Sequence, residues 1–113
     1  MSVFFRRRGE PPATTIAVTI TGTGDSSYCY AIINGTKQYS AGTHEVYAGD
    51  TITFGVYGGS KDGSVTIDGT EVLIATGGST QTYNWTVPNG IQTIEIAMTL
   101  QTNIRGKITV TTA

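Results

Sequence analysis

The stretch TQTYNWTVPNGIQTIEIAMTL, residues 80–100, alternates apolar and polar side chains on both sides of a Pro-Asn-Gly turn sequence. Before the turn, Tyr83, Trp85 and Val87 fall on one face. After the turn, the apolar face consists of Ile94, Ile96, Met98 and Leu100. A period of two is typical of half-buried strands, because successive side chains of a strand point to opposite faces. The stretch therefore predicts two long paired strands, with Trp85 as the largest residue of the core.

The same alternation recurs along the chain between turn sequences, at a spacing of about 8–12 residues that is typical of sandwiches and barrels. The 113 residues include 15 glycines and 21 threonines, which suit turns and strands respectively. Asn34-Gly35 and Asp68-Gly69 predict tight hairpins. Another short pair is expected between residues 44–47 and 51–56. These patterns predict one all-β domain over residues 13–113, a sandwich of about 8–9 antiparallel strands.

Residues 1–12 differ from the rest and predict an extended N-terminal arm. They contain two phenylalanines, three arginines and a pair of prolines, which favour an extended backbone. A frayed tail is one interpretation, since chain ends are often poorly ordered. The other is a docking arm, whose rings fill a groove on a neighbour and whose arginines pair with acidic or phosphate groups. Exposed phenylalanines promote association, which favours docking by Phe4, Phe5, Arg6, Arg7 and Arg8.

The charge distribution excludes several classes of protein. The net charge of the chain is −1. From Ala13 onward the chain has four basic and seven acidic residues, so this part carries a net charge of −3. A nucleic-acid binder needs a basic face rather than three arginines on a tail. No apolar run approaches the ~20 residues that span a bilayer, and an apolar stretch before the arginines reverses the order of a secretion signal. We therefore expect no specific nucleic acid, no membrane and no signal peptide.

No constellation of residues predicts catalysis, a cofactor or a metal. His44 is the only histidine and is expected on the surface at a strand start. Cys29 is the only cysteine and is expected to be a small apolar residue that is buried or half-buried. Zinc sites combine several Cys or His ligands, and a nucleophilic cysteine needs a base. Three aspartates in turns leave calcium as an alternative to a purely structural role, namely Asp50, Asp62 and Asp68. We expect no enzymatic activity.

Five tyrosines within thirty residues form a second candidate binding surface. Tyrosine is enriched at protein interfaces, and its ring can stack on a sugar. The alternative is that tyrosine is a good strand residue whose hydroxyl reaches water at the rim of a sandwich. The residues concerned are Tyr28, Tyr30, Tyr39, Tyr47 and Tyr57.

Several segments resemble the immunoglobulin-like sandwich domains of bacteria and phages. They are AGDTITF at 48–54, VTIDG at 65–69, YNWTVP at 83–88 and GKITVT at 106–111. The chain departs from the antibody type because Cys29 has no second cysteine with which to pair. The opening MSVFFRRRG, residues 1–9, resembles the starts of small structural proteins encoded by phages and prophages of gram-positive bacteria.

This resemblance implies a virion component, made in the bacterial cytoplasm, whose sandwich is displayed and whose arm is inserted. Other virion proteins or copies of the same chain are the partners it implies. The alternative, from another functional class, is an immunoglobulin-like module that binds a glycan or protein on the host surface through the tyrosines. Self-association separates the two hypotheses, because a binding module has no need to form oligomers.

Overall fold

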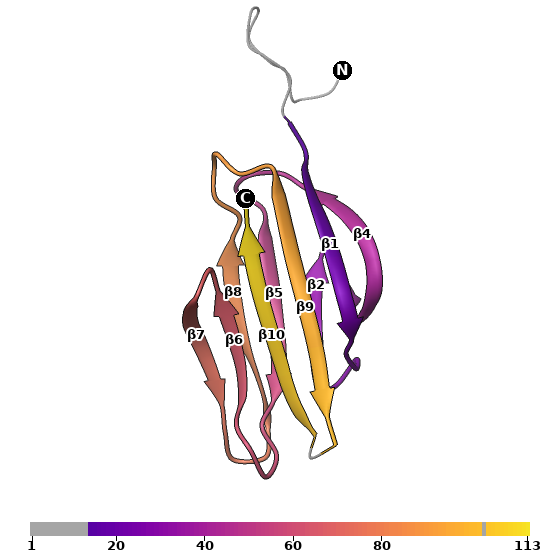
Figure 1. Cartoon of the computed structure of the whole chain (residues 1–113), viewed down its shortest axis with the longest axis vertical. Helices are drawn as coiled ribbons and strands as arrows, with labels where there is room; N and C mark the ends of the chain where they lie inside the picture. The colour runs from indigo at the N-terminus through magenta and orange to yellow at the C-terminus, as the bar shows by residue number, and fades with distance from the viewer. Residues whose placement is uncertain (1–13, 103) are drawn as a thin grey trace, which may run out of the picture.

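The protein is an all-β structure of two packed sheets (Figure 1). The computed structural model describes residues 14–102 and 104–113, so the predicted arm lies outside the described residues. The first sheet has six strands in the order β4 (Ser40–Val46), β1 (Ile16–Thr23), β9 (Thr93–Gln101), β10 (Arg105–Thr112), β6 (Gly63–Ile67) and β7 (Thr70–Ala75). The second has four, in the order β3 (Thr36–Gln38), β2 (Cys29–Ile33), β5 (Thr51–Tyr57) and β8 (Thr80–Thr86).

The prediction of an all-β sandwich is confirmed, but two strand pairs correct its details. The described residues form ten strands, where about eight or nine were expected. β1 pairs with β9 and β6 pairs with β10 in parallel, whereas purely antiparallel pairing was predicted. The strands of each parallel pair are far apart in the sequence. The chain reaches the second strand only after passing through other strands, so its direction is not set by a hairpin.

The two strands of the opening stretch do not pair with each other, which corrects the prediction. β8 pairs with β5 in one sheet, and β9 pairs with β1 and β10 in the other. The end of β8 is kept beside β5 because the Val87 amide donates to the Asp50 carbonyl oxygen at 2.8 Å. The following turn then crosses between the sheets. The predicted pair around residues 48–50 is wrong for the same reason, since β4 and β5 lie in different sheets.

The core lies between the two sheets and is built from the inward-facing residue of each alternation. Ile94, Ile96 and Met98 are buried on β9 as the pattern predicts. Phe54 on β5 is the largest fully buried side chain. Trp85 faces inward opposite Ile52, but it is only half-buried because β8 is an edge strand. The tryptophan ring packs on Phe54 at 6.1 Å between centroids, so it covers the core rather than filling its centre.

Both tight hairpins predicted from the sequence are confirmed. Asn34 and Gly35 have φ angles of 52° and 80°, the left-handed values that a two-residue turn between twisted strands requires. The second turn, at Asp68-Gly69, joins β6 and β7. The Asp68 carboxylate accepts hydrogen bonds from the Thr112 hydroxyl at 2.6 Å and the Thr112 amide at 2.8 Å. The hydroxyl bond, followed by the amide bond, lowers the pKa of Asp68 and fixes the end of β10.

Glycines without side chains let the backbones approach at the end of the sandwich that contains the β9–β10 turn. Gly106 on β10 is buried, and a Cβ placed there would overlap the carbonyl oxygen of Tyr28, the residue just before β2 of the opposite sheet. Gly58 is also buried, and a Cβ there would overlap the carbonyl oxygen of Ala75. The sandwich is therefore closed at this end by backbone contacts instead of packed side chains.

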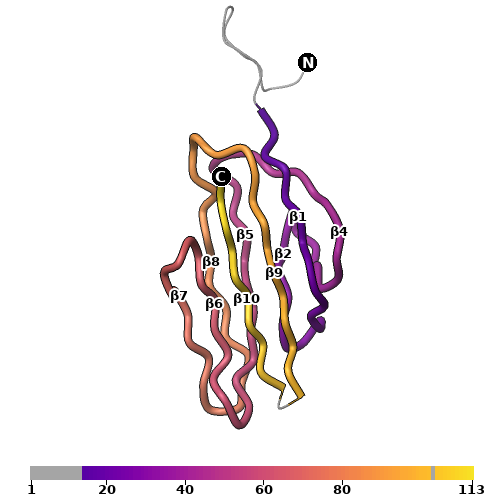
Figure 2. The backbone as a smooth tube through the Cα atoms, in the orientation of Figure 1, coloured from indigo at the N-terminus to yellow at the C-terminus, as the bar shows by residue number. Residues whose placement is uncertain are grey.

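The opposite end of the sandwich holds both the first described residues and the C-terminus (Figure 2). The Ala113 amide donates to the Thr93 carbonyl oxygen at 3.1 Å, and the Ala17 amide donates to the Gln92 carbonyl oxygen at 3.1 Å. β1 and β10 therefore lie on either side of β9. Both terminal strands of the described body are interior strands of the six-stranded sheet.

Candidate binding surfaces

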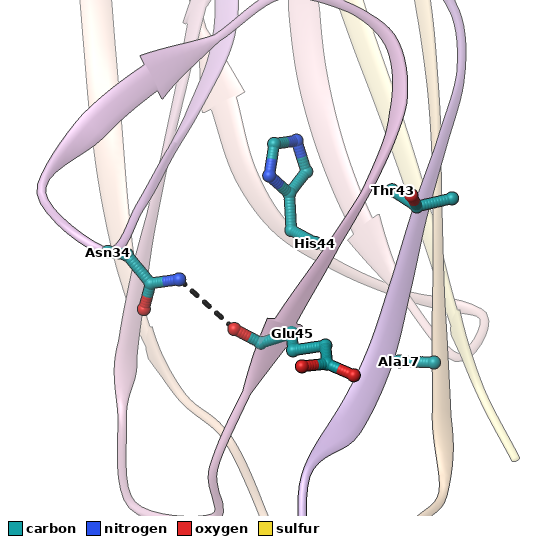
Figure 3. Close-up of a pocket in the computed structure, with 5 residues that line it drawn as sticks. All are labelled: Ala17, Asn34, Thr43, His44 and Glu45. Carbon is teal, nitrogen blue, oxygen red and sulfur yellow. Dashed lines mark hydrogen bonds between the residues drawn. The ribbon is translucent and has the colours of Figure 1, made fainter.

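An open hollow of about 580 Å³ lies beside the edge strand β4, next to the β2–β3 hairpin (Figure 3). It is lined by polar residues from β4 and the β2–β3 turn and by one alanine from β1: Ala17, Asn34, Thr43, His44 and Glu45. The Asn34 side-chain amide donates to the Glu45 carbonyl oxygen at 3.0 Å, which joins the hairpin to β4 across the gap between the sheets. A polar hollow beside an edge strand suits recognition of a peptide backbone better than enclosure of an apolar molecule.

The backbone of β4 presents hydrogen-bonding groups to this hollow. The Ala17 amide bonds to Gln92, so the backbone groups of Ala17 point to β9 and not to β4. In an antiparallel pair the residues alternate between bonded and non-bonded positions. The residue of β4 opposite Ala17 is Glu45, and Thr43 is the next residue in the same phase. The N–H and C=O groups of Thr43 and the N–H of Glu45 therefore point away from β1, toward the open edge.

The inward face of β4 lacks a side chain at Gly42. Gly42 lies opposite the buried Ile20 and so faces the interior, yet it is exposed. A Cβ placed at Gly42 would meet a single neighbour, the His44 Nε2 atom at 3.9 Å. His44 corrects the prediction of an exposed strand start, because it lies inside β4 and is half-buried opposite Val18. Figure 3 shows His44 and Thr43 on opposite sides of the strand.

Three of the five candidate tyrosines gather on the outer face of the four-stranded sheet. The rings of Tyr28 and Tyr57 meet edge to face, with centroids 5.0 Å apart. Tyr30 is 7% exposed, because its ring lies over Gly55 and the Lys37 ammonium lies 4.3 Å from the ring centroid. These rings are largely engaged by each other and by their own sheet. Their arrangement offers little free ring face for stacking on a sugar.

The other two tyrosines lie apart from this cluster and from each other. Tyr39 is 42% exposed where the chain crosses from β3 to β4, and Tyr47 is 46% exposed just after β4. Tyr47 lines a second hollow of about 340 Å³ together with Thr14 and Ile91, beside the first described residues. The five tyrosines therefore do not form one continuous surface. Phe4, Phe5, Arg6, Arg7 and Arg8 lie outside the described residues.

The turn aspartates have structural partners within the described part of the chain. The Asp50 carboxylate accepts a hydrogen bond from the Tyr47 amide at 2.9 Å, and Asp68 binds Thr112. Asp62 lies in the β5–β6 loop, where its carbonyl oxygen accepts a hydrogen bond from Arg105 Nε at 2.6 Å. Among residues 14–102 and 104–113, no group of three or more His, Cys, Asp or Glu side chains is arranged to hold a metal ion.

Cys29 is fully buried, as predicted, and faces the inner layer between the sheets. Its sulfur lies 3.8 Å from the Thr99 carbonyl oxygen and 3.9 Å from that of Lys107. Burial disfavours the charged thiolate and raises the pKa of Cys29 to about 11, against the backbone hydrogen bonds that lower it. The thiol is therefore protonated at neutral pH.

We expect Cys29 to be unreactive in the folded protein, because the thiolate is the nucleophile and it is both scarce and shielded. At pH 8, Ellman's reagent is expected to modify less than a tenth of the thiol in the time that completes the reaction in denaturant. The same chain in guanidinium chloride serves as the control. Prompt and complete modification without denaturant would contradict the burial of this residue.

The β4 edge is not evident from the sequence, because the segment SAGTHEV, residues 40–46, resembles a loop at its start. Glycine and serine usually mark turns, so the sequence predicts a strand only from His44, four residues after β4 begins. The available signal was the alternation of Gly42, His44 and Val46, which share one face of the strand.

No helix long and apolar enough to cross a membrane occurs within the described part of the chain. Comparison with protein-family models, with curated proteins and with solved structures finds no match to this chain.

Proposed function

We propose that this chain is a non-enzymatic structural or accessory protein of a phage virion, a head or tail decoration or an assembly component. Its immunoglobulin-like sandwich is displayed, and its N-terminal arm docks on other virion proteins or on copies of itself. It is made in the bacterial cytoplasm and resides in the virion. The resemblance of residues 1–9 and of the strand motifs to such proteins supports this proposal.

The observation that carries the proposal is the place of β1 in the six-stranded sheet. The arm leads directly into β1, which begins at Ile16 and lies between β4 and β9. β1 pairs with both neighbours along most of its length, and its inward side chains, including Val18 and Ile20, are buried. An arm attached to an interior strand is joined to one of the most firmly held parts of the fold, which suits an anchor.

The architecture supports the immunoglobulin-like assignment. Two sheets enclose a core of alternating inward residues, and several connections cross from one sheet to the other, as in Greek-key sandwiches. The inter-sheet disulfide of antibody domains has no counterpart, since Cys29 is the only cysteine. Phe54 and Trp85 pack together in the region between the sheets and supply aromatic bulk there.

The alternative proposal is an immunoglobulin-like module that binds a glycan or protein on the host surface. The gathering of Tyr28, Tyr30 and Tyr57 on one face favours it. The engagement of these rings with Gly55 and Lys37 weighs against a stacking platform for sugars. We therefore place this alternative second.

Deleting residues 1–12 is expected to leave the sandwich folded and to abolish its incorporation into the particle. The body begins with its own strand at Ile16, so the melting temperature is expected to stay within a few degrees of that of the full chain. Incorporation is measured by mass spectrometry of purified particles, or by co-assembly with the purified partner. Replacing Arg6, Arg7 and Arg8 by glutamate tests the charged half of the arm. Added salt is expected to weaken the contact that these arginines make in the unmodified chain.

A truncated chain that enters particles as well as the full one would overturn the proposal that the arm docks. Loss of a glycan or cell-binding signal on changing the tyrosines, with assembly unaffected, would favour the alternative. Each variant is compared with the full chain at equal concentration, with a thermal melt to show that it is folded.

A further inference from the structure

The open edge of β4 combines three features that together describe a receptor for an extended strand. Its backbone groups at Thr43 and Glu45 point outward, its interior face is vacant at Gly42, and a hollow of about 580 Å³ lies along it. An exposed edge strand is a template for pairing with another chain, and proteins usually block such edges. Within the described structure, only the bond from Asn34 to the Glu45 carbonyl oxygen blocks part of this edge.

The other edges of the two sheets lack this combination. β3 has only three residues. On β8, the inward positions carry the large side chains of Tyr83 and Trp85, which pack on the core. On β7, the positions opposite Val65 and Gly63 carry Leu73 and Ala75, which fill the interior face. Among the described edge strands, β4 is therefore the one that is both longer than three residues and vacant at an interior position.

We infer that the β4 edge is the docking site for the N-terminal arm of a second copy of this chain, which adds to the sheet as a strand antiparallel to β4. This inference rests on the proposed function, in which the arm docks, and it names the surface that receives it. Main-chain hydrogen bonds give such strand addition its affinity, and pockets for alternate side chains give it specificity.

The sequence of the arm matches the vacant position. Phe4 and Phe5 are adjacent, and adjacent residues of a strand point to opposite faces. In any register one of the two rings therefore points to the interior side, and we expect the register that places this ring beside Gly42, where space is left. An aromatic side chain placed across from a glycine on the neighbouring strand is a recurrent way to cover that glycine. The other ring lies on the outer face, where β4 and β1 present the small residues Thr43 and Ala17.

Charge favours the same contact. Residues 1–12 contain three arginines and one glutamate, a charge of +2, whereas the remainder of the chain carries four basic and seven acidic residues, a charge of −3. Glu45 is exposed on β4, and Glu95 is exposed on the outer face two strands away. An arm that runs along β4 brings its arginines toward this acidic body, whose attraction weakens as salt is added.

The geometry of the chain favours the arm of a second copy over the chain's own arm. β1 starts beside the Val46 end of β4, so the chain's own arm would have to run along the edge toward that end, parallel to β4. It would then have to cross over β4 to reach β1, and Pro11 and Pro12 restrict such a reversal. The arm of a second copy has no such constraint and can pair antiparallel, which is the more stable arrangement.

The first test compares the self-association of full-length chains by size-exclusion chromatography with light scattering. Gly42→Val puts a branched side chain at the vacant position, where a Cβ would meet only His44 Nε2 at 3.9 Å. Thr43→Pro removes an outward N–H from the edge. Both variants are expected to weaken association at least tenfold, with unchanged folding in a thermal melt. If Thr43→Pro does not fold, Gly42→Val alone decides the result.

Thr82→Pro is the matched control for Thr43→Pro. Thr82 is an exposed threonine on the edge strand β8. Its amide also points outward. The Tyr57 amide donates to the carbonyl oxygen of Tyr28, the residue before β2, so Tyr57 and Gly55 direct their backbone groups toward β2 and not toward β8. Thr82 lies opposite Gly55 and is therefore at a non-bonded position of the β5–β8 pair. The proline at residue 82 is therefore expected to leave self-association at the wild-type level.

The second test mixes two variants that each lack one half of the contact. Gly42→Val keeps the arm and loses the receptor, while Phe4→Ser with Phe5→Ser keeps the receptor and loses the arm. Each alone is expected to be a monomer, and an equimolar mixture is expected to form a 1:1 dimer and nothing larger. The dimer stops there because the mixture offers one intact contact, between the arm of the Gly42→Val chain and the β4 edge of the serine variant.

Three outcomes would overturn the inference. They are a full-length chain that stays monomeric at every concentration, normal association of Gly42→Val, and a mixture that forms no dimer although the wild-type chain associates. If Gly42→Val associates normally while the arm variant does not, the arm docks elsewhere and the proposed function stands. If the arm variant enters oligomers and particles normally, the proposed function fails as well.

Discussion

Replacing Phe54 with alanine is expected to lower the free energy of unfolding by about 3–5 kcal/mol, the cost of removing a buried aromatic ring. Phe54 is fully buried on β5, an interior strand of the four-stranded sheet, and its ring packs on Trp85. The loss combines the transfer free energy of the ring with the cavity that the rigid sheets leave behind. It is a large share of the ~5–15 kcal/mol that stabilises a typical domain. Chemical denaturation of both chains measures it.

Trp85→Ala is the matched comparison, because it removes a larger ring from the same cluster. Trp85 is only half-buried on the edge strand β8, so much of its surface is in water before the change. We expect a smaller loss than for Phe54→Ala, despite the greater size of tryptophan. If the tryptophan change is the more damaging of the two, the assignment of Phe54 to the centre of the core is wrong.

Gly106→Ala is expected to destabilise the protein by about 1–3 kcal/mol, the usual cost of overpacking. The added methyl group would overlap the Tyr28 carbonyl oxygen, which belongs to the backbone and cannot rotate away. The two sheets must therefore separate at the end where their backbones meet. Such a separation would also loosen the layer around Cys29, whose Cβ lies 3.3 Å from the new atom. The measurement is again chemical denaturation.

Gly42→Ala is its control, since both glycines occupy inward-facing positions of strands. At Gly42 the new methyl group would meet only His44 Nε2, at 3.9 Å. Glycine in a strand costs about 0.5–1 kcal/mol relative to alanine, so this change is expected to be neutral or mildly stabilising. Equal losses for the two glycine variants would show that backbone flexibility, and not the contact with Tyr28, decides the effect at Gly106.

The sequence predicts the strands of this protein better than their partners. Alternation is a local property, so the buried faces of β1, β9 and β10 follow from their residues alone. Pairing depends on where each turn takes the chain. Asn34-Gly35 fixes a hairpin through its φ angles, whereas the Pro-Asn-Gly turn carries the chain from one sheet to the other. A turn motif of similar composition serves both purposes, so the sequence does not distinguish them.

The candidate site was harder to predict than the fold. The exposure of Trp85 and the vacancy at Gly42 both depend on which strands lie at the edges of the sheets. Edge positions follow from the complete strand order and cannot be inferred from any single segment. The tyrosines illustrate the same limit, because their spacing in the sequence suggests one surface. Folding gathers Tyr28, Tyr30 and Tyr57 and leaves Tyr39 and Tyr47 apart.

The interior position of β1 also determines how the sandwich responds to a pulling force. A load applied through the arm acts along β1, parallel to the strand and perpendicular to the hydrogen bonds that join it to β4 and β9. These bonds share the load and must break together, whereas the bonds of a strand peeled from its end break one after another. Forced unfolding is governed by the rate of this step. A sandwich anchored through its arm, as we propose, would therefore resist a pulling force through the shared load on these hydrogen bonds.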